Sequence, residues 1–261
     1  MHTVRELFDL SGRTALVTGG SRGLGLQMAE ALGEQGARLV ISARKQDELD
    51  EAVAHLEQRG CKVAACAANL GEVAGVNALA DFALSTMGQV DILVNNAGAT
   101  WGAPAEDHPV EGWDKVMNLN VRSIFLLCQA IGKRSMIPRR YGRIINTASI
   151  AGFAGNGSPH MQTIGYNTSK AAVINFTRTL AGEWGQYGIT VNALAPGFFP
   201  SKMSRGMLDS MGDEAAQRAP LRRLGDDEDL KGAVLLFASM AGKHITGQTL
   251  AVDGGVSAVL I

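Results

Sequence analysis

Residues 15–25 read Ala15-Leu16-Val17-Thr18-Gly19-Gly20-Ser21-Arg22-Gly23-Leu24-Gly25, a short apolar run that passes into a glycine-rich turn. The run resembles a buried strand, and Leu24, Met28 and Leu32 then recur at helical spacing. Gly19, Gly23 and Gly25 follow a G-x-x-x-G-x-G pattern. A turn without Cβ atoms lets a phosphate approach backbone N–H groups at the positive end of a helix. The stretch therefore predicts a strand–turn–helix unit that can bind a phosphate, although a plain connection could use glycines in the same way.

The alternation of a short apolar run with a longer amphipathic stretch continues along the chain. The predicted strands are Ala15–Thr18, Arg38–Ala43, Val63–Ala67, Val90–Asn95, Arg143–Ala148, Ile189–Leu194 and Thr249–Val252. Most are continuously apolar, which is typical of strands buried on both faces of a parallel sheet. We therefore expect residues 1–261 to form a single α/β domain of the Rossmann type. It should be a doubly wound parallel sheet of about seven strands with helices on both faces.

The stretch Phe198–Asp229 breaks this alternation and is richer in Met, Gly and charged residues. We expect it to be an insertion that acts as a substrate lid, because ligands of such sheets bind outside the carboxyl ends of the strands. At the first strand–helix junction of such a sheet, the Thr18–Gly25 turn favours a dinucleotide.

The end of the second strand, Ile41-Ser42-Ala43-Arg44-Lys45, bears on the choice of cofactor. A site for NAD(H) usually has a carboxylate here that binds the ribose hydroxyls, and this chain has none. Arg44 and Arg22 could instead converge on a 2′-phosphate, which suits the planar guanidinium. The sequence therefore predicts NADP(H), with NAD(H) less favoured.

A second polar motif begins a helical stretch at Tyr166-Asn167-Thr168-Ser169-Lys170. Residues four apart share one face of a helix, so the Tyr166 phenol and the Lys170 ammonium can reach the same site. A phenol has an ordinary pKa of about 10, and a nearby positive charge lowers it. Tyr166 could then exchange a proton with an alcohol. Ser149, at the end of a predicted strand, could hold the reacting oxygen, and the Asn120 amide could order a water that joins Lys170 to solvent.

Over essentially its whole length, the chain resembles the short-chain dehydrogenase/reductase family, in particular its 3-oxoacyl-ACP reductases and gluconate 5-dehydrogenases. The residues that carry the resemblance are Thr18–Gly25, Asn95-Asn96-Ala97-Gly98, Asn120, Ser149, Tyr166, Lys170, Pro196-Gly197 and Val252-Asp253-Gly254-Gly255. The resemblance implies a catalytic tetrad of Asn120, Ser149, Tyr166 and Lys170. Together with the glycine turn and the two arginines, the resemblance also predicts which residues contact the cofactor. These are Gly19, Ser21, Arg22, Gly23, Leu24, Gly25, Arg44, Asn69, Leu70, Asn96, Ala97, Gly98, Tyr166, Lys170, Pro196, Gly197, Phe199 and Ser201. It also implies a homotetramer or homodimer.

The chain departs from the family pattern in three places. Asn69 stands where the family commonly has Asp, and Ser201 where it often has Thr, so hydrogen-bonding groups are kept. The third departure is a longer segment between Ser149 and Tyr166, with its surplus at Ser158–Thr163. Loop insertions are tolerated and often carry specificity, so His160 in this segment could touch a polar substrate.

The substrate is less well defined than the cofactor. Phe198, Phe199, Met203, Met207, Met211 and Trp101 could form an apolar wall, or could simply pack the lid onto the core. An apolar wall favours a 3-oxoacyl thioester, carrier-linked or CoA-linked, and Lys202 and Arg205 could attract a charged carrier. The main alternative is an NAD(P)-dependent sugar-acid or polyol dehydrogenase of the gluconate type. A non-catalytic nucleotide-sensing regulator is the alternative from another class, but such a protein should have lost one of the four polar residues.

The composition limits the other classes of protein. The formal net charge is −1, which gives no reason to expect nucleic acid as a partner. No signal peptide and no long apolar span is recognisable, so we expect a cytoplasmic enzyme that does not bind a membrane. Cys61, Cys66 and Cys128 lack the spacing of a metal site, and we expect no metal.

Overall fold

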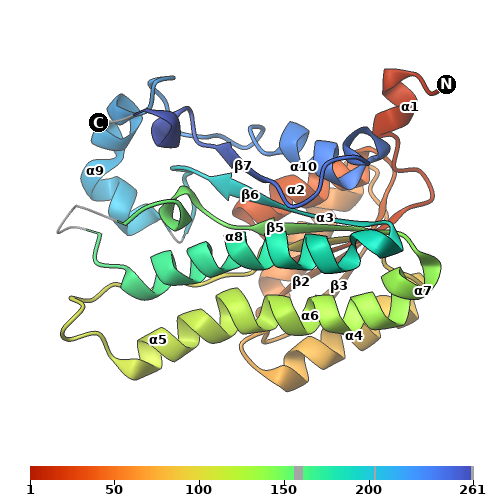
Figure 1. The fold of residues 1–261 in the computed structure, drawn as a ribbon, viewed down its shortest axis with the longest axis horizontal. Coiled ribbons are helices and arrows are strands. Elements are labelled where there is room, and N and C mark those ends of the chain that lie inside the picture. The colour runs from red at the N-terminus through yellow and green to blue at the C-terminus, as the bar shows by residue number, and fades with distance from the viewer. Residues whose placement is uncertain (156–160, 203, 260–261) are drawn as a thin grey trace.

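A computed structural model describes residues 1–155, 161–202 and 204–259, without the side chains of Arg205, Met207, Ser210 and Met211. Within this part of the chain, seven strands form one parallel sheet in the order β3-β2-β1-β4-β5-β6-β7 (Figure 1). The strands are β1 Thr14–Thr18, β2 Arg38–Ala43, β3 Val63–Ala67, β4 Ile92–Asn95, β5 Gly142–Thr147, β6 Ile189–Pro196 and β7 Thr249–Val252. The predicted fold class is confirmed, and each predicted strand is present within two residues of its expected ends.

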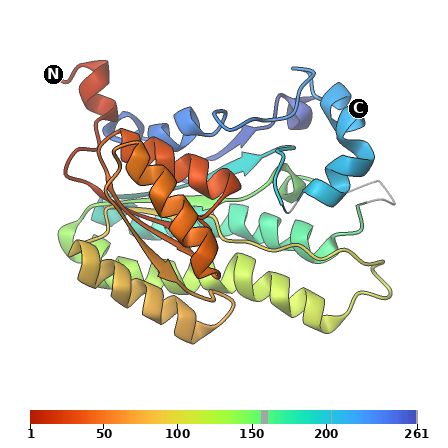
Figure 2. The same cartoon turned by 180° about the vertical axis from the view of Figure 1, so that it is seen from behind.

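Helices cover both faces of the sheet, as Figures 1 and 2 show. Along β1, the side chain of Leu16 packs on one face with α4, α6 and α8, whereas Ala15 and Val17 pack on the other with α2, α3 and α10. The helical elements are α1 Val4–Phe8, α2 Gly23–Glu34, α3 Gln46–Gln58, α4 Val73–Met87, α5 Val110–Met117, η1 Asn118–Arg122, α6 Ser123–Ile131, η2 Gly132–Met136, α7 Ile137–Arg139, η3 Ile150–Gly152, α8 Ile164–Trp184, η4 Gly185–Tyr187, α9 Arg205–Arg218, α10 Lys231–Ala238, η5 Met240–Gly242 and η6 Val256–Ala258.

The strand order changes direction between β1 and β4, which are paired although two other strands separate them in sequence. Such a switch point leaves a crevice at the carboxyl ends of the strands, which is where ligands bind in these sheets. The glycine turn after β1 and the segment after β4 both emerge at this place. In Figure 1, α9 lies beyond the tip of the β6 arrow, at the same edge of the sheet.

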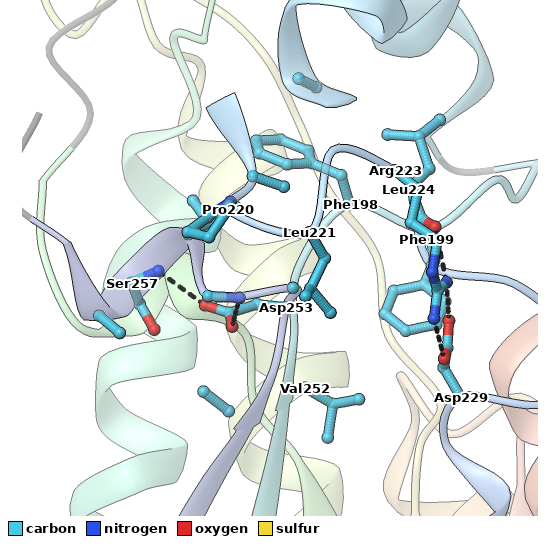
Figure 3. A pocket seen from close by; sticks show the side chains of 18 residues that line it. Phe198, Phe199, Pro220, Leu221, Arg223, Leu224, Asp229, Val252, Asp253 and Ser257 are labelled. Atoms are coloured by element: carbon cyan, nitrogen blue, oxygen red, sulfur yellow. Dashed lines mark hydrogen bonds and ion pairs between the residues drawn. The ribbon is translucent and has the colours of Figure 1, made fainter. Parts of the chain in front are cut away.

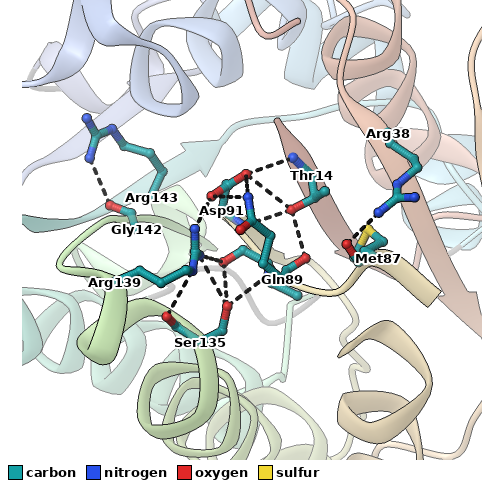
Figure 4. A network of polar contacts seen from close by, with 10 residues as sticks. Thr14, Arg38, Met87, Gln89, Asp91, Ser135, Arg139, Gly142 and Arg143 are labelled. Carbon is teal, nitrogen blue, oxygen red and sulfur yellow. Dashed lines mark hydrogen bonds and ion pairs between the residues drawn. The ribbon is translucent and has the colours of Figure 1, made fainter. Parts of the chain in front are cut away.

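A buried polar network stabilises the amino edge of the sheet, opposite the crevice (Figure 4). The Asp91 carboxylate, 0% exposed, accepts hydrogen bonds from the Thr14 backbone N–H at 3.1 Å and from Arg139 Nη1 at 2.6 Å. Arg139 also donates to the Val90 carbonyl at 2.8 Å. A buried charge is tolerated only where it is paired and hydrogen-bonded. The network therefore joins β1, the start of β4 and α7 at the amino edge, away from the crevice.

Three further observations bear on the expectations from sequence. In the described residues, no helix is long and apolar enough to cross a membrane. No group of His, Cys, Asp or Glu side chains among them could hold a metal ion. Cys61 and Cys128 are buried free thiols, whereas Cys66 is partly exposed on β3.

Candidate active site

The glycine turn after β1 needs its glycines for two different reasons. Gly19 and Gly23 adopt positive φ angles of +64° and +52°, which residues with a Cβ atom rarely do. Gly25 lies in the first turn of α2, where a Cβ would be 2.1 Å from the Gly19 carbonyl oxygen and 2.5 Å from Asn96 Nδ2. The start of the helix therefore packs directly on the turn, and its N-terminus faces the crevice.

The segment after β4 is tied to this turn. The Thr18 hydroxyl accepts hydrogen bonds from the backbone N–H groups of Asn96 and Ala97, at 2.9 and 3.0 Å. Asn96 Nδ2 donates to the carbonyls of Thr18 and Gly19, both at 3.1 Å. These contacts fix the position of the glycine turn relative to the segment after β4, and the two form walls of the crevice. In the sequence, Thr18 is only the first residue of the glycine motif, and the signal for its structural role is a hydroxyl at the last position of the strand.

A groove of about 560 Å³ runs from this region past the end of β2. Arg22 and Arg44 both line it, as predicted for a 2′-phosphate site, and so do Asn69 and Gly98. Lys115 and Lys202 add positive charge to the same groove, and Glu72 is the acidic residue among those that line it. The groove therefore suits an anionic ligand.

Tyr166 and Lys170 lie in the first two turns of α8 on one face, as the i, i+4 spacing predicted. Lys170 Nζ is 5.5 Å from the centre of the Tyr166 ring and donates to the Thr147 carbonyl at 2.7 Å. Lys170 is 5% exposed, and this burial lowers its pKa to about 8. Burial raises the pKa of Tyr166, and a hydrogen bond with Ser149 opposes that rise. Since burial is the larger effect on Tyr166, the protein's own groups do not produce the expected lowering of its pKa.

Ser149 follows β5 and caps η3, where its hydroxyl accepts a hydrogen bond from the Ala151 N–H at 3.1 Å. Gly98 lies on the other side of the site, where a Cβ atom would be 3.8 Å from Lys170 Nζ and 3.3 Å from Asn120 Oδ1. Ser149, Tyr166, Lys170 and Gly98 thus meet at the carboxyl edge of the sheet, between β4, β5 and α8.

Asn120 is buried in the π-helical turn η1 within the long helix after β4. Its Oδ1 accepts from the Ala99 N–H at 2.8 Å, and its Nδ2 donates to the Ala99 carbonyl and to Ser169 Oγ, both at 2.9 Å. Both amide hydrogens are therefore used within the protein. The side chain clamps the segment after β4, which differs from the water-ordering role expected from the sequence.

The residues of the segment after β6 make different kinds of contact. Gly197 packs against Asp253, where a Cβ would be 2.7 Å from the Asp253 Cβ. Phe199 is buried in the core beside α2 and α10, so its ring packs the segment down rather than forming a substrate wall. The Ser201 hydroxyl is bonded to Ser204 Oγ at 2.9 Å. Met203 and His160 lie outside the described residues, as do residues 158 and 159 of the Ser158–Thr163 insertion.

A second cavity, of about 540 Å³, lies between α9 and the C-terminal segment (Figure 3). Phe198, Leu221 and Asp253 line it, and an Arg223–Asp229 ion pair of 2.5 and 2.7 Å closes one side. Its lining does not include the four predicted catalytic residues, so it is distinct from the crevice around Tyr166.

Comparison with known proteins agrees with this geometry. A family model described as enoyl-(acyl carrier protein) reductase matches residues 19–257. The gluconate 5-dehydrogenase of Gluconobacter oxydans (strain 621H) is 37% identical over 261 residues, covering 98% of each chain. The chain belongs to the short-chain dehydrogenase/reductase family. It is therefore an oxidoreductase, as the sequence predicted.

Two further relatives of this short-chain dehydrogenase/reductase carry different names. The 3-oxoacyl-[acyl-carrier-protein] reductase of rhamnolipid biosynthesis in Pseudomonas aeruginosa is 40% identical over 254 residues, which cover 95% of this chain and 97% of the relative. A solved gluconate 5-dehydrogenase from Burkholderia cenocepacia J2315, in complex with NADP and tartrate, superposes with a TM-score of 0.92 at 33% identity. That match covers 99% of this chain and all of the other. Both substrate classes expected from the sequence are thus represented among the relatives, and neither is favoured.

Proposed function

We propose that this short-chain dehydrogenase/reductase uses NADP(H) to interconvert a ketone and a secondary alcohol, with Tyr166 as the general acid and base. One observation carries the proposal: Tyr166, Lys170 and Ser149 meet beside Gly98 at the edge of the sheet where the glycine turn also emerges. A proton-transfer group, a cation and a hydroxyl are the groups that this reaction requires of the protein.

Each residue has a distinct role in the proposed reaction. The Ser149 hydroxyl holds the reacting oxygen, and Tyr166 takes the alcohol proton in oxidation and returns it in reduction. The Lys170 ammonium is mainly protonated at neutral pH because its pKa is about 8, and its charge stabilises the phenolate. Asn120 positions the segment after β4 beside Lys170 through its clamp on Ala99.

The residues around the groove fit a nicotinamide dinucleotide phosphate. The turn at Gly19 and Gly23 brings backbone N–H groups to the N-terminus of α2, which suits a pyrophosphate. Arg22 and Arg44 line the groove where a 2′-phosphate would add two negative charges. When bound, the nicotinamide supplies or accepts the hydride, and its oxidised form adds positive charge that favours phenolate at Tyr166. The solved relative that contains NADP supports the same assignment.

The remaining predicted cofactor contacts fall into two groups. The first group borders the crevice: Leu24 lies in the first turn of α2, Pro196 is the last residue of β6, and the others lie in the connections that follow strands, namely Ser21, Asn69, Asn96, Ala97, Gly197 and Ser201. Leu70 and Phe199 have buried side chains, so they would contribute through their backbone. The segment 198–229, with α9 at the carboxyl edge of the sheet, would act as the substrate lid of the single domain.

For the substrate, a carrier-linked or CoA-linked 3-oxoacyl thioester is the first candidate and a sugar acid of the gluconate type the second. Relatives of similar identity bear both names. The structure places Trp101 against the backbone of Gly112 in α5, with Lys115 Nζ 5.1 Å from the centre of its ring. Lys115 lines the groove, and an aromatic ring beside this cation is compatible with either class.

The experiment is a turnover assay that follows NADPH absorbance with 3-oxoacyl thioesters and keto-gluconates, and NADP reduction with gluconates. Turnover that is at least tenfold faster with one class assigns the substrate. Tight NADPH binding without turnover on any ketone or alcohol would refute the proposed reaction and favour a nucleotide-sensing protein.

The protein would act in the cytoplasm as a homotetramer or homodimer, without nucleic acid or membrane. Phe125, 48% exposed on α6, is one of the large apolar side chains left on the surface of this helix layer. A contiguous apolar patch rather than a single exposed side chain marks a contact between proteins, so the proposed assembly rests on the family resemblance. Light scattering on the purified protein would give the assembly state, and a monomer at micromolar concentration would contradict the proposal.

A further inference from the structure

The Glu48 carboxylate is the meeting point of three cations from separate parts of the chain. Glu48 Oε1 lies 2.7 Å from Arg22 Nη1, 3.6 Å from Lys45 Nζ and 3.7 Å from Lys202 Nζ. Arg22 belongs to the glycine turn, Lys45 precedes α3 and Lys202 follows β6. No role is expected for Glu48 from the sequence, whereas Lys202 is expected there to attract a charged substrate carrier.

The charges at this point are unbalanced. One carboxylate faces three positive charges, and the exposed Arg44 is adjacent to Lys45 in the chain. Glu48 is fixed in the first turn of α3 with a side chain 20% exposed, whereas its partners are 48–61% exposed and held by one shared oxygen. The two lysine contacts are long for ion pairs. A dianionic phosphate offers three acceptor oxygens and would satisfy these cations better than one carboxylate does.

The same side chains border the groove assigned to the cofactor. Arg22, Arg44 and Lys202 all line it, so Lys202 brings a positive charge to the adenosine end of the groove from the segment that leads into α9. We propose that Lys202 is a specificity-determining cation for the 2′-phosphate of NADP(H), and that Glu48 takes the place of this phosphate in the free enzyme. The inference rests on the proposed use of NADP(H). The phosphate would displace Glu48 and draw the start of the lid toward the groove.

Substitutions of Lys202 and of Glu48 should then change the affinity for NADPH in opposite directions. Lys202→Met removes an attraction to the phosphate, and Glu48→Gln removes a competitor for it. If the pair were only a tether between α3 and the lid, either substitution would break it and both would act in the same direction. The sign of the two effects therefore separates the two accounts.

The experiment measures the dissociation constants of NADPH and NADH by cofactor fluorescence for the wild type and for each variant. Lys202→Met should weaken NADPH binding about tenfold, the typical effect of losing one charge-assisted contact, and leave NADH nearly unchanged. Glu48→Gln should strengthen NADPH binding about threefold, as expected for a partly exposed charge. Lys115→Met is the matched control, because Lys115 lines the same groove without contacting Glu48, so its NADPH-to-NADH ratio should stay at the wild-type value.

Hydrogen exchange of α9 supplies a second readout that does not depend on turnover. At saturation, NADPH should protect residues 205–218 more than NADH does, and Lys202→Met should abolish that difference. If the wild type binds neither cofactor, the proposed function itself fails. If the wild type prefers NADPH while both variants weaken it, or neither changes it, the role given to Lys202 and Glu48 is wrong.

Discussion

Replacing Lys170 by methionine should change how the stability of this protein depends on pH. The Lys170 ammonium is buried and donates to the Thr147 carbonyl, and burial lowers its pKa from 10.5 to about 8. Between these two values, the unfolded chain holds the proton more tightly than the folded protein does. The free energy of unfolding therefore rises as the pH rises through this window. Below pH 8 the full cost of burying the charge is present.

The magnitude follows from the shift. At about 1.4 kcal/mol per pH unit, a change from 10.5 to about 8 corresponds to about 3 kcal/mol. Methionine has nearly the same length and no charge, so Lys170→Met removes this dependence. It also leaves the Thr147 carbonyl without its donor, a loss that is the same at every pH. The difference in stability between wild type and variant should thus move by about 3 kcal/mol in favour of the wild type between pH 7 and pH 10.5.

The assay is urea unfolding of both proteins at fixed protein concentration across this pH range. The exposed Lys133, changed to methionine, is the matched control for the loss of a lysine at the surface. A difference for Lys170→Met that does not change with pH would refute the reasoning, because it would mean that the Lys170 ammonium is solvated in the folded protein.

Three further predictions concern the cofactor and the sheet. Arg44→Asp should lower the affinity for NADPH at least tenfold more than that for NADH in equilibrium binding, because it places a carboxylate beside the 2′-phosphate; equal losses would sink the assignment. Gly25→Ala should abolish dinucleotide binding and lower the free energy of unfolding by about 2 kcal/mol or more, since the methyl group would lie 2.1 Å from the Gly19 carbonyl; tight cofactor binding by a stable variant would contradict this. Asp91→Ala should destabilise the protein by about 3 kcal/mol in urea unfolding, because it removes the acceptor of the buried Thr14 backbone N–H and of the partly buried Arg139 guanidinium, whereas Asp81→Ala, at an exposed ion pair, should cost less than about 1 kcal/mol. Equal effects would mean that the network of Figure 4 does not stabilise the fold.

The fold was predictable because its signals are local. Strands buried on both faces are continuously apolar, so the run at Ala15–Thr18 and its counterparts stand out in the sequence. Helix faces were predicted almost as well, since Met28 and Leu32 are fully buried, although Leu24 at the start of α2 is only partly buried. At a helix end, the apolar stripe can extend past the core that the rest of the helix covers.

The sequence predicted which residues form the site better than it predicted what those residues contact. The spacing of Tyr166 and Lys170 placed both in one site, yet the rise of the Tyr166 pKa depends on burial, which no spacing reveals. Asn120 contacts Ala99 from a π-helical turn within a long helix, and the sequence pattern indicates neither this turn nor the contact. The cluster at Glu48 joins long side chains from distant parts of the chain, and only the folded structure brings them together.

The central claim is that Tyr166 transfers the proton, and the turnover of Tyr166→Phe tests it most directly. Phenylalanine keeps the ring and removes the hydroxyl, so NADPH binding and stability should stay close to wild type. The rate constant kcat on an active ketone should fall about 10²- to 10⁴-fold, the usual contribution of a positioned acid or base. A variant that binds NADPH normally and turns over within a few-fold of the wild type would contradict the account.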